Sequence, residues 1–360
     1  MQRPILVMAG GTGGHVFPAL AVAENLRQRG ENIVWLGTRS GLEARVVPAA
    51  DFAIEWLSVQ GLRGKGLLTL LLAPFRLLRA CWQALRVLRR TRPKAVLGMG
   101  GFVSGPGGLM AWLLNIPLFL HEQNSIIGLT NRILSRLATR SFFAFPDAAK
   151  SVPRSECIGN PVRASFVDMG DPEIRLQARL QQPLQLLVIG GSLGAAALNR
   201  CLPEAIACLE REQRPRVRHQ CGEKHLQQCE LNYRTARVEA EVVSFIEDMA
   251  EAYTWADLVV CRAGALTIAE LSAAGVGSLL IPFPYAVDNH QYHNARYLEQ
   301  NDAAQILPEA ELSVENLALK LKFFQQNRPA LVEMARKARA CFQADATERL
   351  ASGILAEARP

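Results

Sequence analysis

Short, continuous apolar runs alternate with longer helical patterns along most of the chain. A strand that is buried on both faces of a parallel sheet has such a run as its sequence, and the helices between the runs supply the crossovers. We therefore predict an α/β fold built on parallel sheets. The strand-like runs are residues 5–8, 33–36, 95–98, 117–121 and 141–145 in the first half, and 186–189, 217–220, 242–245, 258–261 and 278–282 in the second.

One strand–turn–helix pattern occurs twice. Residues 5–8 lead into the glycine-rich residues 10–14, and residues 186–189 lead into the glycine-rich residues 190–194, in a chain of 360. A single turn of this kind is often only a tight connection. Two copies instead predict two Rossmann-like domains that face a cleft, in which backbone N–H groups at each helix start bind phosphate.

A Gly-Asn-Pro segment at residues 159–161 is the best candidate for the linker between the domains. We expect residues 1–161 to form an N-terminal domain and residues 162–340 a C-terminal domain. A last helical segment, from about 330 to 357, has no strand after it. We expect its end, about residues 341–360, to pack back on the first domain.

Composition adds two constraints. The longest strongly apolar stretch, residues 67–78, contains Thr69, Pro74 and Arg76, and it is shorter than the roughly 20 residues of a membrane-spanning helix. No signal peptide is apparent either, so we expect a soluble or peripheral protein. The eight cysteines include no Cys-x-x-Cys pair, which is typical of reduced thiols rather than of a disulfide framework.

Positive charge is concentrated in the first half. Residues 1–162 hold 19 Lys and Arg against 8 Asp and Glu, whereas the rest of the chain holds 21 against 25. No acidic residue lies between Glu55 and Glu122, an interval with nine basic ones. Such a field indicates an anionic partner for this half only. Because the interval also contains Trp82, Trp112 and many leucines, an anionic membrane surface is a better match than nucleic acid.

Residues 75–90 predict a helix with arginines along one face, at spacings of three and four. An ordinary crossover helix with a solvated outer face has the same pattern, so both interpretations stay open. The leucines that precede this helix favour membrane docking, because they exceed what one short segment can bury. The expected membrane contacts are Leu67, Leu68, Leu71, Phe75, Arg76, Arg79 and Arg86.

A nicotinamide-binding enzyme is the main alternative among Rossmann-like proteins. It requires Gly-x-Gly-x-x-Gly after the first strand and an acidic residue at the end of the second. Val16 stands where the third glycine would be needed. The second strand runs into Gly37-Thr38-Arg39, which contains no carboxylate. Both requirements fail.

Five motifs, in order along nearly the whole chain, point to one family. They are Gly-Gly-Thr-Gly-Gly-His-Val-Phe-Pro at residues 10–18, His-Glu-Gln-Asn at 121–124, Gly-Asn-Pro-Val-Arg at 159–163, Gly-Gly-Ser at 190–192 and Arg-Ala-Gly-Ala-Leu-Thr-Ile-Ala-Glu at 262–270. Together they resemble the bacterial enzymes that add N-acetylglucosamine to undecaprenyl-diphosphate-linked muramyl-pentapeptide in peptidoglycan synthesis. The resemblance implies the GT-B architecture, with the donor nucleotide mainly on the second domain and the acceptor on the first. It also implies a peripheral location at the cytoplasmic face of the bacterial cell membrane.

Glycosyl transfer requires stabilisation of the leaving diphosphate and a base for the acceptor hydroxyl. The chain has no Asp-x-Asp motif for a metal ion, so we expect no metal and no other cofactor. Helix N-termini, the hydroxyls of Thr12 and Ser192, and the cation of Arg163 would carry the diphosphate charge instead. His15 is the candidate base, since a helix N-terminus favours the neutral imidazole. Glu122, at a strand end, is the rival base, and either residue could instead be structural.

By resemblance, Glu270 accepts hydrogen bonds from the ribose hydroxyls and Ile246 contacts uracil. Gln291 and His290 reach the donor sugar or the diphosphate. The full set of donor-binding residues implied is Thr12, Gly13, Gly14, Asn124, Arg163, Ser192, Ile246, Ala265, Leu266, Thr267, Ile268, Ala269, Glu270, His290 and Gln291.

We therefore predict an inverting N-acetylglucosaminyltransferase. Its partners would be UDP-N-acetylglucosamine, a lipid-linked muramyl-pentapeptide acceptor and an anionic membrane surface, and not nucleic acid. The alternatives are another GT-B enzyme such as a UDP-N-acetylglucosamine 2-epimerase, the nicotinamide enzyme disfavoured above, and a non-catalytic membrane-associated scaffold.

Overall fold

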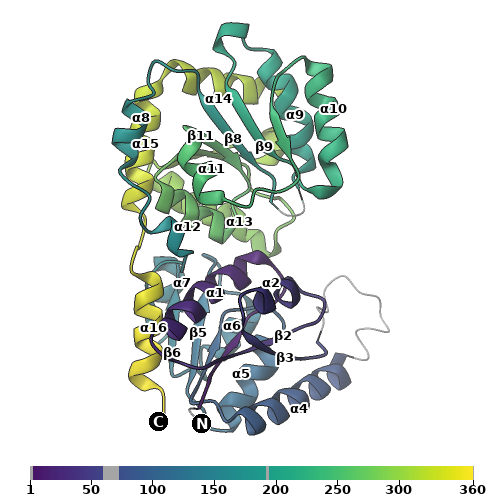
Figure 1. Ribbon diagram of the computed structural model, residues 1–360, viewed down its shortest axis with the longest axis vertical. Helices are drawn as coiled ribbons and strands as arrows, with labels where there is room; N and C mark the ends of the chain where they lie inside the picture. Colours follow the sequence, from purple (N-terminus) through teal and green to yellow (C-terminus); the bar gives the residue numbers. More distant parts are fainter. Residues whose placement is uncertain (1–2, 60–72, 192–193, 360) are drawn as a thin grey trace. The chain divides into compact units, whose positions relative to one another are not determined.

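A computed structural model describes residues 3–59, 73–191 and 194–359 of the chain (Figure 1). The chain divides into two compact units. Unit 1 comprises Met1–Arg163 together with Gln343–Pro360, and unit 2 comprises Ala164–Phe342. Each unit contains one β-sheet in which all paired strands are parallel. The predicted α/β class with two Rossmann-like domains is therefore confirmed.

Unit 1 has a seven-stranded sheet in the order β3-β2-β1-β4-β5-β6-β7. Its strands are β1 (Ile5–Met8), β2 (Ile33–Gly37), β3 (Ala53–Trp56), β4 (Ala95–Gly98), β5 (Leu118–Glu122), β6 (Arg140–Phe143) and β7 (Ser155–Cys157). Its helices are α1 (Gly13–Gln28), α2 (Glu43–Ala49), α4 (Ala73–Thr91), α5 (Ser104–Leu113), α6 (Leu129–Leu134), α7 (Pro146–Lys150) and α16 (Ala346–Glu357).

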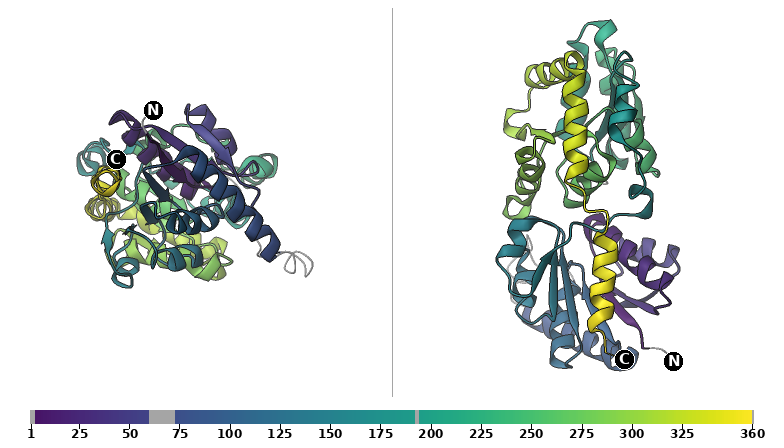
Figure 2. Two further views of the ribbon diagram at one scale, coloured as in Figure 1. Left: turned by 90° about the horizontal axis from the view of Figure 1, so that it is seen from below. Right: turned by 90° about the vertical axis from the view of Figure 1, so that its left-hand side faces the viewer.

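Alternate residues of β1 enter two separate cores. Ile5 and Val7 pack in the core that α1 and α16 complete, and these two helices lie side by side (Figures 1 and 2). Leu6 and Met8 pack in the core that α4 and α5 complete. Both faces of the strand are buried, which is why its sequence is a continuous apolar run rather than an alternating one.

Unit 2 has a six-stranded sheet in the order β10-β9-β8-β11-β12-β13. Its strands are β8 (Gln185–Ile189), β9 (Arg216–Gln220), β10 (Glu241–Val243), β11 (Leu258–Cys261), β12 (Gly277–Leu280) and β13 (Ala304–Ile306). Its helices are η1 (Ala164–Phe166), α8 (Pro172–Gln177), α9 (Ala196–Ala207), η2 (Arg211–Gln213), η3 (Glu223–His225), α10 (Leu226–Ala236), α11 (Met249–Trp255), α12 (Ala265–Ala274), η4 (Val287–Asn289), α13 (His290–Gln300), η5 (Glu309–Glu311), α14 (Val314–Gln326) and α15 (Arg328–Ala340).

The sequence pattern missed three strands, namely β3, β7 and β13. Each lies at the edge of its sheet and has residues that are only partly buried. An edge strand has a neighbour on one side only and tolerates polar residues, so it lacks the continuous apolar run of a central strand. The missed strands therefore share one physical cause.

The last helical segment, which the sequence pattern predicts to run from about 330 to 357, is not continuous. It consists of two helices, α15 and α16, separated by residues 341–345. The first packs in unit 2 against α8, α12 and β12. The second belongs to unit 1 and packs on α1.

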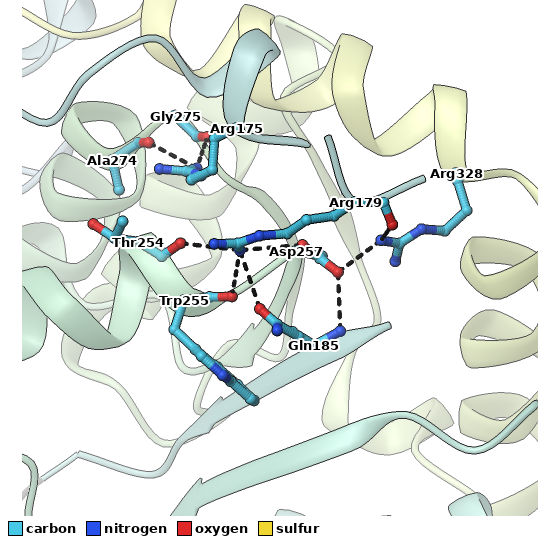
Figure 3. A network of polar contacts seen from close by, with 9 residues as sticks. All are labelled: Arg175, Arg179, Gln185, Thr254, Trp255, Asp257, Ala274, Gly275 and Arg328. Atoms are coloured by element: carbon cyan, nitrogen blue, oxygen red, sulfur yellow. Dashed lines mark hydrogen bonds and ion pairs between the residues drawn. The ribbon is translucent and has the colours of Figure 1, made fainter. Parts of the chain in front are cut away.

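A buried ionic network fixes the amino-terminal edge of the sheet in unit 2 (Figure 3). Asp257 precedes β11 and is fully buried. Its Oδ2 accepts hydrogen bonds from the backbone N–H of Gln185 at 3.0 Å and from Nη2 of Arg328 at 2.7 Å. Arg179 lies 3.6 Å from the other carboxylate oxygen. Two cations and a backbone donor compensate the buried charge, so the network joins α15 to the start of β8 and β11.

Candidate active site

Adjacent parallel strands bring three distant loops of unit 1 together. The carboxyl ends of β1, β4 and β5 lie next to one another in the sheet, at the edge where ligands bind in α/β proteins. The loop after β1 is the first glycine turn (residues 10–14), the loop after β4 contains Gly100, and β5 runs into Gln123. The side chain of His15 contacts both other loops. Its Nδ1 lies 2.9 Å from Oε1 of Gln123, and a Cβ added at Gly100 would come within 2.6 Å of the same nitrogen.

The first glycine turn leads directly into α1. Gly11 has a φ of +95°, a backbone conformation that residues with a side chain rarely adopt. Thr12 is the extended residue before the helix. The helix begins at Gly13, which places Gly14 and His15 in its first turn. The N–H of His15 already donates to the carbonyl of Thr12 at 3.1 Å. The first-turn N–H groups of Gly13 and Gly14 have no acceptor within the helix, so these are the ones that can bind an anion.

A buried carboxylate that the sequence analysis missed supports this turn. Glu43, at the start of α2, is fully buried. Its Oε2 accepts from the N–H of Gly11 at 2.9 Å, while its Oε1 accepts from the N–H and the hydroxyl of Thr38 at 2.9 and 2.7 Å. A single glutamate in a short helical pattern has no distinguishing sequence signal. Only the folded chain reveals that it joins the first glycine turn to the end of β2.

Glu122 is the last residue of β5, and its side chain is almost completely buried. One carboxylate oxygen accepts from the backbone and side-chain nitrogens of Asn124, at 3.1 and 3.3 Å. The other accepts from the N–H of Gly128 at 3.1 Å and from Nδ2 of Asn131 at 2.9 Å. Four donors thus converge on this carboxylate, which gives it the geometry of a loop-organising acceptor.

His121 precedes Glu122 and is also fully buried. Burial lowers the pKa of His121 to about 4, although its hydrogen bond with the carbonyl of Gly159 acts in the opposite direction. The ring is therefore neutral at physiological pH. Its Nε2 lies 2.9 Å from that carbonyl oxygen, and its Nδ1 lies 3.1 Å from Nε2 of Gln123.

Arg163 is the last residue of unit 1 before the chain enters unit 2. Its guanidinium carbon lies 5.5 Å from the centre of the Phe17 ring, on α1. This cation–π contact directs the positive charge towards the helix that follows the first glycine turn.

The second glycine turn (residues 190–194) follows β8 in unit 2, and its residues Ser192 and Leu193 lie outside the described residues. Gln220, the last residue of the neighbouring strand β9, supports it. The carbonyl of Gln220 accepts from the N–H of Gly190 at 2.9 Å, and its side-chain Nε2 donates to the carbonyl of Gly191 at 3.2 Å. At Gly194, φ is +75° and a Cβ would lie 2.3 Å from the carbonyl oxygen of Cys221, so only glycine fits.

The other donor-binding residues predicted in unit 2 all follow the carboxyl end of a strand. Ile246 is half-buried in the loop after β10, and residues 265–270 open α12 after β11. Glu270 is buried, and its Oε2 accepts from the hydroxyl of Tyr253 at 3.4 Å. His290 and Gln291 open α13, after β12.

The contacts of these last two residues differ. Oε1 of Gln291 accepts from the N–H of Phe283 at 2.9 Å, which ties the helix start to the loop after β12. The half-buried His290 has its Nδ1 at 2.7 Å from the carbonyl oxygen of Val287. Among the described residues, no group of three or more His, Cys, Asp or Glu side chains could hold a metal ion.

A second candidate surface lies on the outer side of α4, α5 and α6. α5 contacts both of the other helices. Although their inner sides pack on the sheet, Phe75, Leu78 and Trp82 of α4 are 70%, 67% and 56% exposed. The neighbouring helices add further exposed apolar side chains, namely Trp112, Leu113, Leu129 and Ile133. No helix within the described ranges is long and apolar enough to cross a membrane.

Arg76, Arg79 and Arg86 lie among these apolar side chains and are exposed. The guanidinium of Arg86 stacks 4.8 Å from the centre of the Trp82 ring. The predicted membrane contacts Leu67, Leu68 and Leu71 lie outside the described residues.

Comparison with known proteins gives a consistent result. The family model "Glycosyltransferase family 28 N-terminal domain" matches residues 5–143, and "Glycosyltransferase family 28 C-terminal domain" matches residues 185–350. The chain is 56% identical to the UDP-N-acetylglucosamine--N-acetylmuramyl-(pentapeptide) pyrophosphoryl-undecaprenol N-acetylglucosamine transferase of Alkalilimnicola ehrlichii, with 100% of both chains covered. It is 54% identical to the protein of the same name from Nitrosococcus oceani, with 99% of both covered.

Solved structures agree with these sequence matches. The crystal structure of Acinetobacter baumannii MurG superimposes with a TM-score of 0.84 at 40% identity, covering 98% of this chain and 99% of that one. The calicheamicin glycosyltransferase CalG4 has a TM-score of 0.70 at 15% identity, covering 99% and 98% of the two chains, and shares the fold.

Proposed function

The chain belongs to glycosyltransferase family 28, and on this premise we propose that it transfers N-acetylglucosamine from UDP-N-acetylglucosamine to an undecaprenyl-diphosphate-linked muramyl-pentapeptide. The observation that carries the proposal is its full-length similarity, at 56% and 54% identity, to two transferases of that name. Their names do not favour the alternative, a 2-epimerase.

The reaction is a single displacement with inversion at the anomeric carbon. His15 removes the proton from the acceptor hydroxyl, whose oxygen attacks the anomeric carbon while the bond to the diphosphate breaks. We assign the base to His15 because four hydrogen-bond donors already converge on Glu122. The acceptor therefore belongs to unit 1.

The donor belongs mainly to unit 2. The second glycine turn offers backbone N–H groups to the diphosphate, with Ser192 as a hydroxyl donor and Arg163 as a further cation. Glu270, on α12, accepts hydrogen bonds from the ribose hydroxyls. The remaining contacts are those that the family resemblance implies, including Ile246 with uracil and Gln291 with the sugar or the diphosphate.

The test is UDP release from UDP-N-acetylglucosamine with and without a lipid-linked muramyl-pentapeptide. We expect release only with the acceptor, together with a disaccharide product. An epimerase would convert the donor sugar without any acceptor, and a scaffold would release no UDP in either case. Either of these results would contradict the proposed activity.

The lipid of the acceptor keeps it in the bilayer, so we further propose peripheral docking at the cytoplasmic face of the cell membrane through the outer side of α4, α5 and α6. The exposed apolar side chains of these helices insert into the bilayer, and Arg76, Arg79 and Arg86 contact anionic lipid headgroups. Each basic residue at such a surface contributes roughly 1 kcal/mol, and together with an apolar wedge this gives reversible binding.

Vesicle binding tests the docking proposal. We expect binding to anionic vesicles to fall steeply with salt and to be lost when Arg76, Arg79 and Arg86 are all changed to Glu. The matched control changes the exposed Arg200, Arg211 and Arg234 of unit 2 to Glu, which alters the net charge equally and should leave binding intact. Equal binding to neutral vesicles, or equal losses in both variants, would contradict docking through this surface.

A further inference from the structure

We propose that Gln123 and His121 form a hydrogen-bond relay that fixes the tautomer of His15, with the proton on Nδ1 and the lone pair on Nε2. Nε2 is then the nitrogen that receives the acceptor's proton. The inference rests on the proposed role of His15 as base. It assigns a positioning role to two residues, neither of which touches the reacting atoms.

The direction of the relay is set at its buried end. The carbonyl oxygen of Gly159 lies 2.9 Å from Nε2 of His121, and a carbonyl can only accept a hydrogen bond. Nε2 of His121 must therefore carry the proton. Because this ring is fully buried and neutral, it carries no second proton, and its Nδ1 must be an acceptor.

The amide of Gln123 transmits this direction. Its Nε2 lies 3.1 Å from Nδ1 of His121 and 3.2 Å from the carbonyl oxygen of the same residue. Both of these atoms are acceptors, so the NH₂ group, and not the oxygen, must face them. The amide oxygen then faces His15, whose Nδ1 lies 2.9 Å away. Since that oxygen can only accept, Nδ1 of His15 must carry the proton.

The backbone around the relay is held in place. Nδ2 of Asn160 donates to the carbonyl of Gln123 at 3.0 Å. Gly159 has a φ of +82°, and a Cβ there would lie 2.6 Å from Cβ of Gln343, in the segment that returns to unit 1. Gly100 packs against the ring of His15 from the other loop. The ring therefore has little room to flip and present its other nitrogen.

An amide is a suitable partner for a base that must release its proton again. When Nε2 takes up a proton, the Nδ1–H of the imidazolium donates more strongly to the amide oxygen, because one partner is then charged. A carboxylate in the same place would hold the proton more tightly. Gln123 thus does for His15 what a carboxylate does in a Ser-His-Asp triad, without adding a negative charge.

The direct test is long-range ¹H–¹⁵N NMR of the full-length protein labelled with ¹⁵N at its six histidines, with His15→Gln and His121→Asn used for assignment. We expect a protonated Nδ1 and an unprotonated Nε2 in His15, and the opposite tautomer in His121. In Gln123→Met, which can neither donate nor accept in the same way, His15 should lose its single tautomer. A proton on Nε2 of wild-type His15, or an unchanged tautomer in Gln123→Met, would overturn the relay.

Kinetics separate positioning from a merely structural role. Gln123→Met should lower kcat about tenfold or more, with the KM for UDP-N-acetylglucosamine within about twofold of wild type. His121→Asn should preserve kcat, because its amide supplies both a donor and an acceptor, whereas His121→Leu should resemble Gln123→Met. The control Gln185→Met removes a buried amide at the amino-terminal end of β8, in the sheet of unit 2. It should leave kcat unchanged. A wild-type kcat in His121→Leu would overturn the relay.

Separate measurements test His15 as the base and the relay that orients it. If His15→Ala retains full turnover, the base assignment fails. The NMR result would still decide the relay, because the tautomer is read in the resting protein without substrate.

Discussion

The two glycine turns begin with similar sequences but have different surroundings. In the first turn, the buried carboxylate of Glu43 accepts a hydrogen bond from the N–H of Gly11. In the second, the neutral amide of Gln220 donates to the carbonyl of Gly191. The position that His15 occupies after the first turn is filled by Ala195 after the second, where the side chain is buried.

This difference indicates that the two glycine turns have different functions. A carboxylate beneath the first turn occupies one of its N–H groups and places negative charge close to any anion bound there. The second turn has no carboxylate among its described partners, so its N–H groups and helix start are better suited to a diphosphate. We interpret the first turn chiefly as the support of the base and the second as the cradle of the leaving group.

The largest expected effect is that of His15→Ala. Removing a general base should lower turnover about a hundredfold or more and leave donor affinity nearly unchanged. Steady-state kinetics and calorimetric titration with UDP-N-acetylglucosamine measure the two quantities. A loss confined to donor affinity would make the two turns alike in function and remove the proposed contrast.

Glu43→Ala tests the support of the first turn. The change leaves three donors, on Gly11 and Thr38, without their acceptor, so we expect the free energy of unfolding of unit 1 to fall by about 2–4 kcal/mol. Gln220→Leu, the counterpart in unit 2, should cost about 1 kcal/mol, because it removes one neutral hydrogen bond.

Urea unfolding can follow this pair of variants through Trp35 in unit 1, whose indole donates to the carbonyl of Ala9 at 2.8 Å, and through Trp255 in unit 2. Equal losses in the two variants would show that the carboxylate has no special part in the first turn.

Glu270→Ala should weaken binding of the UDP donor and leave the rate of the chemical step unchanged. The loss of a charged acceptor for the ribose hydroxyls should reduce UDP affinity roughly tenfold, with the fold intact by circular dichroism. This is the converse of the pattern expected for His15→Ala. Unchanged donor affinity would refute the ribose contact.

The smallest effect concerns acid stability, to which each unit contributes one fully buried histidine. Burial lowers the pKa of His121 to about 4 and that of His219 to about 3. Because the unfolded chain then binds more protons below pH 6.5, stability is lost as the pH falls through this range. From pH 6.5 to 5.5 each histidine should reduce the free energy of unfolding by about 1 kcal/mol at most.

His121→Asn should flatten this pH dependence in unit 1, and His219→Asn should flatten it in unit 2. Unfolding curves at several pH values, followed by the same two tryptophans, measure the slopes. A slope that neither variant changes would show that these histidines do not titrate on unfolding.

The central strands, the two glycine turns and the helices that begin after them could all be predicted from the sequence alone. These features are local: a strand buried on both faces must be apolar throughout, and a turn with positive φ at Gly11 or Gly191 requires glycine. The edge strands β3, β7 and β13 were missed because one open side relaxes that requirement, whereas the edge strand β10 was predicted. The family motifs then identified residues such as Glu270, which the structure places on the helix after β11.

The contacts between distant side chains could be found only in the folded protein. Gln123 lies 108 residues after His15 in the chain, yet their polar atoms are 2.9 Å apart because β1, β4 and β5 are neighbours in the sheet. Glu43 reaches Gly11 from a helix that follows β2, the neighbour of β1 on the other side. Hydrophobic periodicity reports whether a strand is buried, but it does not report the order of strands. The partners of His15 and of the first glycine turn therefore could not be predicted from sequence patterns, because strand order is set by how the crossover helices pack.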